Sequence, residues 1–114
     1  MTLTHVDTDE LSWESVPDSW EGKTREDEPG VRFKRFSFGS LAISSGMIVE
    51  FEPGHHEIEH SHQEDELFFI LDGEMDVSGR RATAGTLVFI EGGTRYSLDT
   101  GADGSRYLRL EIQT

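Results

Sequence analysis

From residue 31 onward, apolar and polar residues alternate in short segments that turn-forming residues separate. Two examples are VRFKRFSF, residues 31–38, and MIVEFEPG, residues 47–54. Successive side chains of a strand point to opposite faces of a sheet, so this period predicts strands with one buried face. No ten-residue window shows the apolar period of 3.6 that marks an amphipathic helix. The chain is therefore expected to be all-β.

Glycine-containing turns divide the second half of the chain into further strands. ELFFILDG, residues 66–73, is apolar on both faces and ends in Asp-Gly, a strong hairpin signal. We expect further hairpin turns at residues 78–79 and 99–103, and strands at residues 86–90 and 106–112. Short strands with regular turns between them indicate an antiparallel sandwich or barrel.

The first thirty residues differ from the rest of the chain. They carry nine acidic residues and two turn-like segments, VPDSWEG and EDEPG. Trp13 and Trp20 are their large anchors, and solvated tails seldom contain two tryptophans. We therefore expect residues 1–30 to form an irregular acidic arm that the tryptophans hold on a barrel of residues 31–114. A partly disordered leader is the alternative.

The composition is strongly acidic. Asp and Glu number 23 against 10 Lys and Arg, which gives a formal net charge of −13. Such a surface repels the phosphates of nucleic acids and anionic membranes, so neither is an expected partner. Only two of the ten cations are lysines. This balance is expected of a protein in a very salty cytosol, where salt screens the repulsion, and a halophilic source is our hypothesis.

Several other classes of protein are excluded by what the sequence lacks. It contains no cysteine, so it has no disulfide, thiolate metal site or cysteine nucleophile. Its first ten residues, MTLTHVDTDE, have neither the basic start nor the apolar segment of a secretory signal. No apolar run approaches the roughly 18 residues of a membrane span. A soluble cytoplasmic protein is the expectation.

Four of the five histidines lie within eight residues of one another, interleaved with carboxylates. His60 and His62 are two residues apart, so in a strand both imidazoles lie on the same face. Glu66 has the same parity, and a short turn at residues 63–65 can bring its carboxylate beside them. Two imidazoles and one carboxylate leave coordination positions open. This ligand set suits Fe(II) and also accommodates Mn, Ni, Co or Zn.

Apolar residues and further acids surround these three candidate ligands. Phe68 and Ile70 continue the face of Glu66, where they would line the site and exclude water. The acids oppose one another's ionisation, and a bound dication would relieve that repulsion. A salt-adapted surface is the alternative, and it is the better interpretation for Glu57, Glu59, Glu64 and Asp65. The adjacent histidines at 55–56 do not fit the ligand pattern and are expected in an exposed turn.

The segment from Gly54 to Gly73 resembles the first signature motif of the cupins. That motif is glycine, five residues, His-x-His, three or four residues, glutamate, six residues and glycine. Here the matching positions are Gly54, His60, His62, Glu66 and Gly73, and none departs from the motif. The motif combines five fixed positions at fixed spacing, which makes the resemblance specific.

GTLVFIEGGTRYSLDT resembles the second cupin motif, which is glycine, five residues, Pro-x-Gly, two residues, histidine, three residues and asparagine. Gly85 and Gly93 match in place. Glu91 stands where proline is usual, Tyr96 where the histidine ligand is usual, and Thr100 where asparagine is usual. The resemblance covers roughly residues 31–112.

The resemblance implies a small antiparallel double-stranded jelly-roll β-barrel with a metal ion in its mouth. Cupins usually hold the metal with the two histidines and the glutamate of the first motif and the histidine of the second. This ligand set carries over to His60, His62 and Glu66, and Tyr96 takes the fourth place. Tyr96 has three interpretations: a phenolate ligand, a protonated phenol that transfers protons or orients substrate, or a packed residue whose hydroxyl bonds to a backbone partner.

Three functions remain open at this stage. The first is a mononuclear metalloenzyme of dioxygenase, isomerase or lyase type that acts on a small organic molecule. The second is a non-catalytic module that binds or senses a small ligand, with or without metal. The third is a scaffold whose metal site has decayed. The fold alone cannot choose among them, because it is reused for many functions.

The apolar strand at residues 66–71 bears on assembly. If Glu66, Phe68 and Ile70 face the interior, the alternate residues Leu67, Phe69 and Leu71 need cover on the other side. The second sheet, the arm or a partner subunit can supply it. Small cupins commonly pair, so we expect a homodimer.

Overall fold

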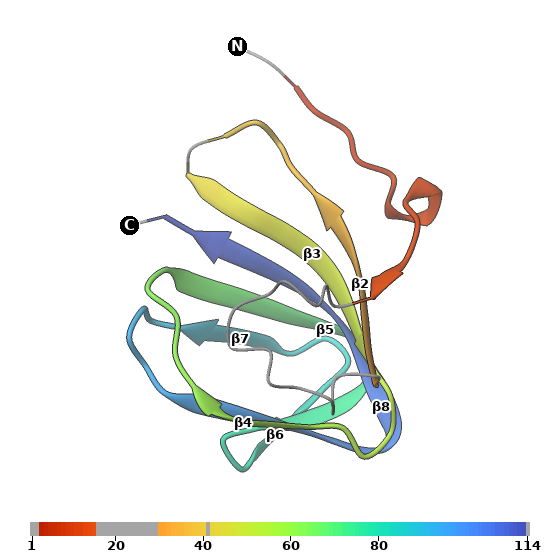
Figure 1. Ribbon diagram of the computed structural model, residues 1–114, viewed down its shortest axis with the longest axis vertical. Coiled ribbons are helices and arrows are strands. Elements are labelled where there is room, and N and C mark those ends of the chain that lie inside the picture. The colour runs from red at the N-terminus through yellow and green to blue at the C-terminus, as the bar shows by residue number, and fades with distance from the viewer. Residues whose placement is uncertain (1–2, 16–29, 41, 114) are drawn as a thin grey trace.

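The computed structural model describes residues 3–15, 30–40 and 42–113, and within them the protein is made of antiparallel strands and one 3-10 turn (Figure 1). No helix in this part of the chain is long and apolar enough to span a membrane. The prediction of an all-β chain is confirmed. The elements are η1 (Thr8–Glu10), β1 (Glu14–Ser15), β2 (Val31–Phe36), β3 (Ile43–Phe51), β4 (His56–His60), β5 (Asp65–Val77), β6 (Arg80–Thr83), β7 (Leu87–Ile90) and β8 (Tyr96–Ile112).

Two long strands, β5 and β8, run through both layers of the fold. Residues 105–112 of β8 lie between β3 and the first half of β5 and pair with both. In the same layer, β7 pairs with β5, and β2 and then β1 extend the sheet beyond β3. Residues 96–100 of β8 pair with β4 and the second half of β5, which also carries β6. Figure 1 shows β2, β3 and β7 in one layer, here called the first layer, and β4 and β6 in the second layer. The predicted jelly roll is confirmed, although the pairing among the described strands does not close into a ring.

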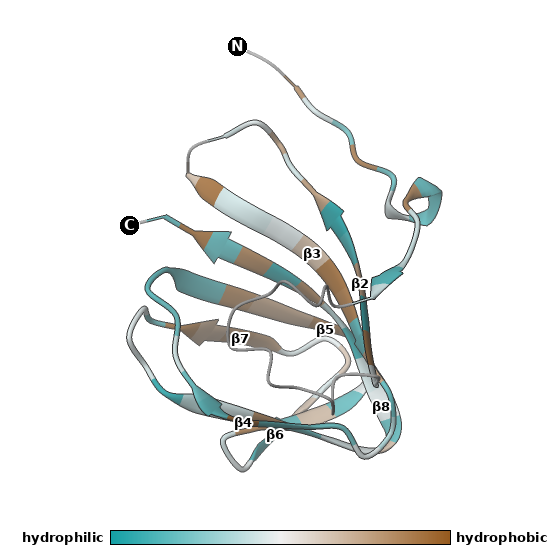
Figure 2. Cartoon of the chain, viewed as in Figure 1, coloured by the Kyte–Doolittle hydropathy of each residue, from teal (hydrophilic) through white to brown (hydrophobic). Residues whose placement is uncertain are grey.

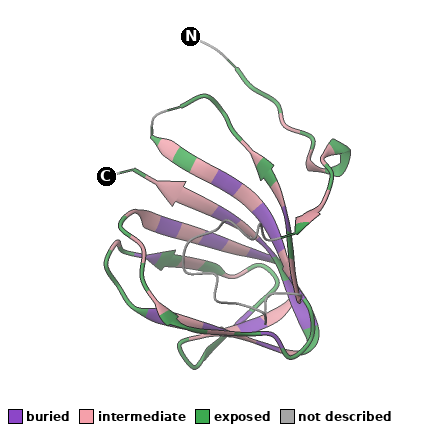
Figure 3. Ribbon diagram, viewed as in Figure 1, coloured by how far each residue is buried: buried purple, intermediate pink, exposed green. Residues whose placement is uncertain are grey.

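The hydrophobic core lies between the two layers. Four of its most buried side chains are at most 1% exposed and lie on β2 (Phe33), β5 (Phe68 and Ile70) and β8 (Leu98). Figure 2 shows the apolar residues along these strands, and Figure 3 shows buried positions alternating with more exposed ones along β3 and β5. Full burial of such a side chain contributes about 1.5–3 kcal/mol. This core fixes which face of β5 and β8 points inward.

The predicted hairpin turn at residues 72–73 is wrong. Strand β5 continues through this Asp-Gly pair to Val77, and its pairing with β8 is irregular on both sides of it. Gly73 has a φ of 73°, and a Cβ at this position would lie 2.2 Å from the carbonyl oxygen of Gly104. Glycine is required here because β5 and β8 approach closely at the bend, and not because the chain reverses.

The predicted hairpin turn at residues 99–103 is also wrong, because β8 is continuous from Tyr96 to Ile112. The strand changes partner here instead: Asp99 pairs with β4, whereas Ser105 pairs with β3. The turn at residues 78–79 is confirmed. It joins β5 to β6 with positive φ values at Ser78 and Gly79, of 50° and 85°.

The described part of the first thirty residues contacts the outer side of the first layer. The Trp13 ring centroid lies 4.2 Å from the guanidinium carbon of Arg32, 4.7 Å from Lys34 Nζ and 5.5 Å from the guanidinium carbon of Arg106. Cations over an indole face are attracted to it. Trp20 lies outside the described residues, and the division into an arm and a barrel at residue 30 stays a prediction.

Candidate metal centre

His60 and His62 lie beside Tyr96 where β4 ends and β8 begins. His60 pairs directly with Tyr96 across these strands. The centroids of the two imidazole rings are 5.1 Å apart, and they lie 4.6 Å (His60) and 6.3 Å (His62) from the centroid of the Tyr96 ring. The spacing in the sequence therefore correctly predicted that the two histidines are neighbours. Their role as ligands stays a prediction.

Both imidazoles have the chemistry that a metal ligand needs. Nδ1 of His60 lies 2.8 Å from the carbonyl oxygen of Ile58 and donates its hydrogen to it. Nε2 of His60 then keeps its lone pair, which is how histidine ligands are commonly oriented. Burial lowers the pKa of His62, and the nearby Arg109 and His60 lower it further, while the Glu66 charge opposes them. The neutral, metal-binding form of His62 is thus favoured.

Glu66 begins the inward face of β5 and is only 1% exposed. Its Oε1 accepts a hydrogen bond of 2.8 Å from the Tyr96 hydroxyl. Its Oε2 accepts from Arg109, whose Nε and Nη2 both lie 2.7 Å away. A buried carboxylate is costly unless it is paired and hydrogen-bonded, and both conditions are met here.

Arg109 is a residue of this cluster that the predicted ligand set does not contain. It lies on β8 opposite Phe68, and its side chain is 10% exposed. Its Nη2 also donates to Glu111 Oε1 at 2.6 Å. Burial lowers the pKa of Arg109, but the charges of Glu66 and Glu111 outweigh this and raise it above its usual value. The signal in the sequence was the parity of RYLRLEI, in which Arg109 and Glu111 share the face opposite to the leucines.

The Tyr96 hydroxyl is a proton donor in this arrangement. Burial raises the pKa of Tyr96 far above its usual value, and the charge of Glu66 and the hydrogen bond to it raise it further. Its partner is a side-chain carboxylate, and not the backbone group that one interpretation of Tyr96 expected. Behind it, the Phe68 ring lies 6.0 Å away between centroids, and Phe68 and Ile70 are both 0% exposed.

The donor chemistry fits a divalent transition metal, but the present position of Glu66 does not. Among the described residues, no group of three or more His, Asp or Glu side chains is arranged to hold an ion. In the present arrangement, Tyr96 and Arg109 are the hydrogen-bond partners of the two Glu66 oxygens. A metal at the histidines would have to take Oε1 from the Tyr96 hydroxyl. The bond from Arg109 to Oε2 can persist, because each carboxylate oxygen has two lone pairs.

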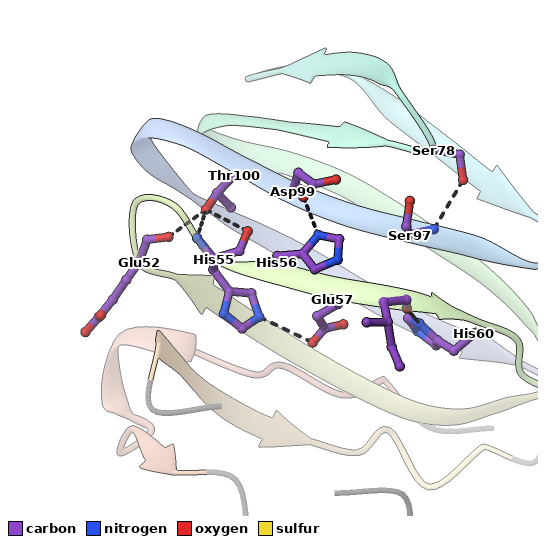
Figure 4. A network of polar contacts seen from close by, with 10 residues as sticks. Glu52, His55, His56, Glu57, His60, Ser78, Ser97, Asp99 and Thr100 are labelled. Carbon is purple, nitrogen blue, oxygen red and sulfur yellow. Dashed lines mark hydrogen bonds and ion pairs between the residues drawn. The ribbon is translucent and has the colours of Figure 1, made fainter. Parts of the chain in front are cut away.

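The adjacent histidines His55 and His56 have different environments (Figure 4). His56 is exposed, as predicted, and its Nδ1 contacts the Asp99 carboxylate. The prediction of an exposed turn is wrong for His55, which is 8% exposed. Its ring packs on Phe51 with 4.5 Å between centroids, and its backbone N–H donates to Thr100 Oγ1 at 2.8 Å. These contacts hold His55 inside the barrel, away from the candidate ligands.

The interpretation of the flanking acids as a salt-adapted surface holds for only some of them. Glu59 is exposed and pairs with Arg95 at 2.7 Å. Glu57 is only 16% exposed, and its Oε2 lies 3.6 Å from Nε2 of His55. The Asp65 carboxylate accepts a hydrogen bond of 2.7 Å from the Gly92 backbone N–H. Glu57 and Asp65 are thus parts of the fold, because Glu57 lies beside the buried His55 and Asp65 bonds to a backbone N–H.

The comparison with known families agrees with this architecture. The family described as the ChrR cupin-like domain matches residues 2–108. The chain is a member of the ChrR cupin-like family. The cupin resemblance of the two motifs is therefore confirmed. No curated protein matches the chain.

Solved structures show the same cupin fold at low sequence identity. KdgF from Halomonas sp. superposes with a TM-score of 0.77 at 19% identity, over 99% of this chain and 96% of that one. A predicted oxalate decarboxylase from Thermotoga maritima gives 0.77 at 20% identity, over 97% and 100%. The Rhodobacter sphaeroides complex of SigE with the anti-sigma ChrR gives 0.70 at 16% identity, over 92% of this chain and 51% of that one. Identities this low show the fold alone.

Proposed function

We propose that this cupin binds one divalent transition-metal ion through His60, His62 and Glu66 and acts as a mononuclear metalloenzyme on a small organic molecule. The observation that carries the proposal is that both imidazoles meet beside Tyr96 next to the buried Glu66. The ligand set is compatible with Fe, Mn, Ni, Co or Zn. Bound there, the ion supplies Lewis acidity toward a substrate oxygen, which serves O₂-dependent cleavage, isomerisation and elimination.

In this proposal, Tyr96 exchanges a proton with the substrate or orients it, and Phe68 excludes water from the site. Tyr96 holds a proton at Oη, 2.8 Å from a carboxylate oxygen, so it can exchange that proton with a substrate atom beside the histidines or orient a substrate oxygen. Fully buried Phe68 packs behind the Tyr96 ring. It leaves that side of the phenol without water, which strengthens the polar contacts.

A non-catalytic module that binds a small ligand is the second candidate. The observation that favours it is that Tyr96 and Arg109 already satisfy both oxygens of Glu66, so the site is complete without a metal. One solved cupin neighbour is an anti-sigma protein in complex with SigE. A barrel of this kind can therefore belong to a protein that acts by binding.

Metal content tests the proposal directly. Purified protein, reconstituted separately with each of the five ions and desalted, would be compared with His60→Ala and with the matched control His56→Ala. His56 lies on the same strand but is exposed and pairs with Asp99. We expect one ion per chain in the wild type and in the control, and loss of it in His60→Ala. Thermal unfolding with and without metal should show stabilisation only where metal is bound.

Catalysis is tested on the metal-loaded protein. O₂ consumption and product formation by mass spectrometry would be followed with a panel of sugars, diketones and hydroxy acids. Turnover that His60→Ala loses and His56→Ala keeps supports the enzyme. A loaded but silent protein supports the binding module. If His60→Ala leaves both metal content and unfolding temperature unchanged, the metal site is refuted.

A further inference from the structure

Two inward-facing carboxylates share one buried cation at the candidate site. Glu66 on β5 pairs directly with Glu111 on β8, so their side chains project from the same face of the sheet. Arg109 donates to both of them, at 2.7 Å and 2.6 Å. Glu66 is 1% exposed and the Glu111 side chain 20%. Two negative groups against one guanidinium leave this cluster one negative charge.

We propose that Arg109 is an internal counter-cation that balances Glu66 and Glu111 in the metal-free protein and thereby limits the affinity of the site for a dication. This inference rests on the proposed metal site and adds to it the residue that sets its strength. Arg109 is suited to the task because its planar fork reaches two carboxylates at once. It is a positioning residue, because its described contacts are with Glu66 and Glu111 and not with the histidines.

The charge balance explains the direction of the effect. With Arg109 present, a dication beside Glu66 would leave the cluster with a net positive charge. Without Arg109, the same dication would neutralise the two carboxylates. A guanidinium and a dication bound to the same buried carboxylate would repel each other, and at the effective dielectric of a protein this repulsion is large. Removal of the guanidinium is therefore expected to tighten metal binding by at least about tenfold.

A binding site for an anionic substrate is the other role a buried arginine could have, and the contacts disfavour it. The guanidinium already serves two carboxylates, whose combined charge exceeds its own. A substrate carboxylate would meet a cluster that is negative overall and a chain with a formal net charge of −13. The electrostatics of this site thus favour a cation.

The test is a titration of the metal-free full-length protein with Co²⁺ at neutral pH, followed by calorimetry and by the visible absorption of the bound ion. Arg109→Gln should bind at least about tenfold more tightly than the wild type. Glu111→Gln should bind at least about threefold more weakly, because Arg109 then balances Glu66 alone. Arg109→Lys keeps the charge and should stay within about threefold of the wild type. A merely structural role would weaken binding in Arg109→Gln and Glu111→Gln alike.

The outcomes separate this inference from the proposed function. If the wild type binds Co²⁺ but Arg109→Gln binds no more tightly, the counter-cation role is refuted and the metal site survives. If only Arg109→Gln binds, Arg109 does block the cation and the native protein is not a metalloenzyme. If neither binds, both proposals are refuted. Should Arg109→Gln fail to fold, Glu111→Gln can still overturn the inference, because unchanged or tighter binding in that variant contradicts the charge balance.

Discussion

The two carboxylate oxygens of Glu66 have different hydrogen-bond partners, so Tyr96 and Arg109 have different roles at this residue. Oε2 accepts from the Arg109 guanidinium and carries the charge balance, whereas Oε1 accepts from the Tyr96 hydroxyl. A hydrogen bond from an uncharged hydroxyl is easier to exchange than a buried ion pair. Oε1 is therefore the oxygen that a metal or a substrate would take, and Tyr96 the group that would be released.

Tyr96→Phe measures how much the hydrogen bond between Tyr96 and Glu66 contributes to the free energy of unfolding. The variant keeps the ring in the core but leaves Oε1 without a donor. Hydrogen bonds to charged groups contribute about 1.5–3 kcal/mol, so the free energy of unfolding should fall by about that amount. Urea denaturation of the metal-free protein measures it. The cost should be smaller in a Glu66→Gln background, because the acceptor is then neutral, and an equal cost in both backgrounds would contradict the assignment.

Acidification should destabilise the metal-free protein through His62. Burial lowers its pKa below the usual 6.5, so between the two values the unfolded state binds more protons than the folded state. The stability that His62 contributes is then intact above about pH 6.5 and is lost as the pH falls toward the lowered pKa. Thermal unfolding across this range would show a steeper decline in the wild type than in His62→Gln. Parallel profiles would rule this contribution out.

For individual residues, the sequence predicted that the two histidines are neighbours, but it did not predict the hydrogen-bond partners of Glu66. Parity along a strand predicted that His60 and His62 are neighbours, because the period of a strand is local. Arg109 lies 43 residues after Glu66, and its burial depends on which face of β8 turns inward. The outward face carries the leucines, so apolar character alone pointed to the wrong face. Only the pairing of β8 with β5 decides this.

At the scale of elements, β5 and β8 bend through both layers where the sequence predicted two hairpins. Asp-Gly permits a positive φ, which suits a hairpin and an irregular strand equally well. What distinguishes them here is the contact of Gly73 with Gly104, 31 residues away, which no local pattern contains. The turn at residues 78–79 was predictable because the residues on its two sides pair directly with each other.

Gly73→Ala tests this reason for the glycine. The new Cβ would meet the Gly104 carbonyl oxygen at 2.2 Å, in addition to the strain of a positive φ. Gly79→Ala is the matched control, because its φ is 85° and a Cβ there meets nothing within 4 Å. We expect the control to lose about 1 kcal/mol of unfolding free energy and Gly73→Ala about 2–4 kcal/mol. Equal losses in chemical denaturation would mean that the close approach is unimportant.

At the scale of the whole molecule, the first layer presents an apolar outer face. Leu87 and Phe89 on β7 are 65% and 60% exposed, and Leu71 on β5 is 42% exposed. Leu67 and Phe69 lie beside them, paired with Phe89 and Leu87 respectively. Leu71, Leu87 and Phe89 are thus exposed in the part of the chain that the structure describes, and apolar area of this kind commonly marks an interface.

We predict that this face pairs two copies of the chain. Light scattering after gel filtration should give a particle of about twice 12.9 kDa. Phe89→Gln should shift the particle toward the monomer, because a buried amide in an apolar contact is costly. Ile58→Gln is the control, since Ile58 is 69% exposed on β4 of the other layer and should leave the dimer intact. A wild-type monomer would contradict the prediction.

Salt dependence belongs to the molecule as a whole, because it reflects the formal net charge of −13. Exposed ion pairs such as Arg95–Glu59 are worth at most about 1 kcal/mol each and weaken in salt, whereas the excess of acids repels itself and gains from screening. We expect the screening of the acidic repulsion to outweigh the weakening of the ion pairs, so the unfolding temperature should be higher at about 2 M KCl than at about 0.05 M.

A variant with two exposed acids neutralised, Glu91→Gln with Asp103→Asn, is the control. It should be more stable than the wild type at low salt only, because screening removes the same repulsion at high salt. An advantage that persists at high salt would mean that excluded-salt effects, and not charge repulsion, govern the stability of this cupin.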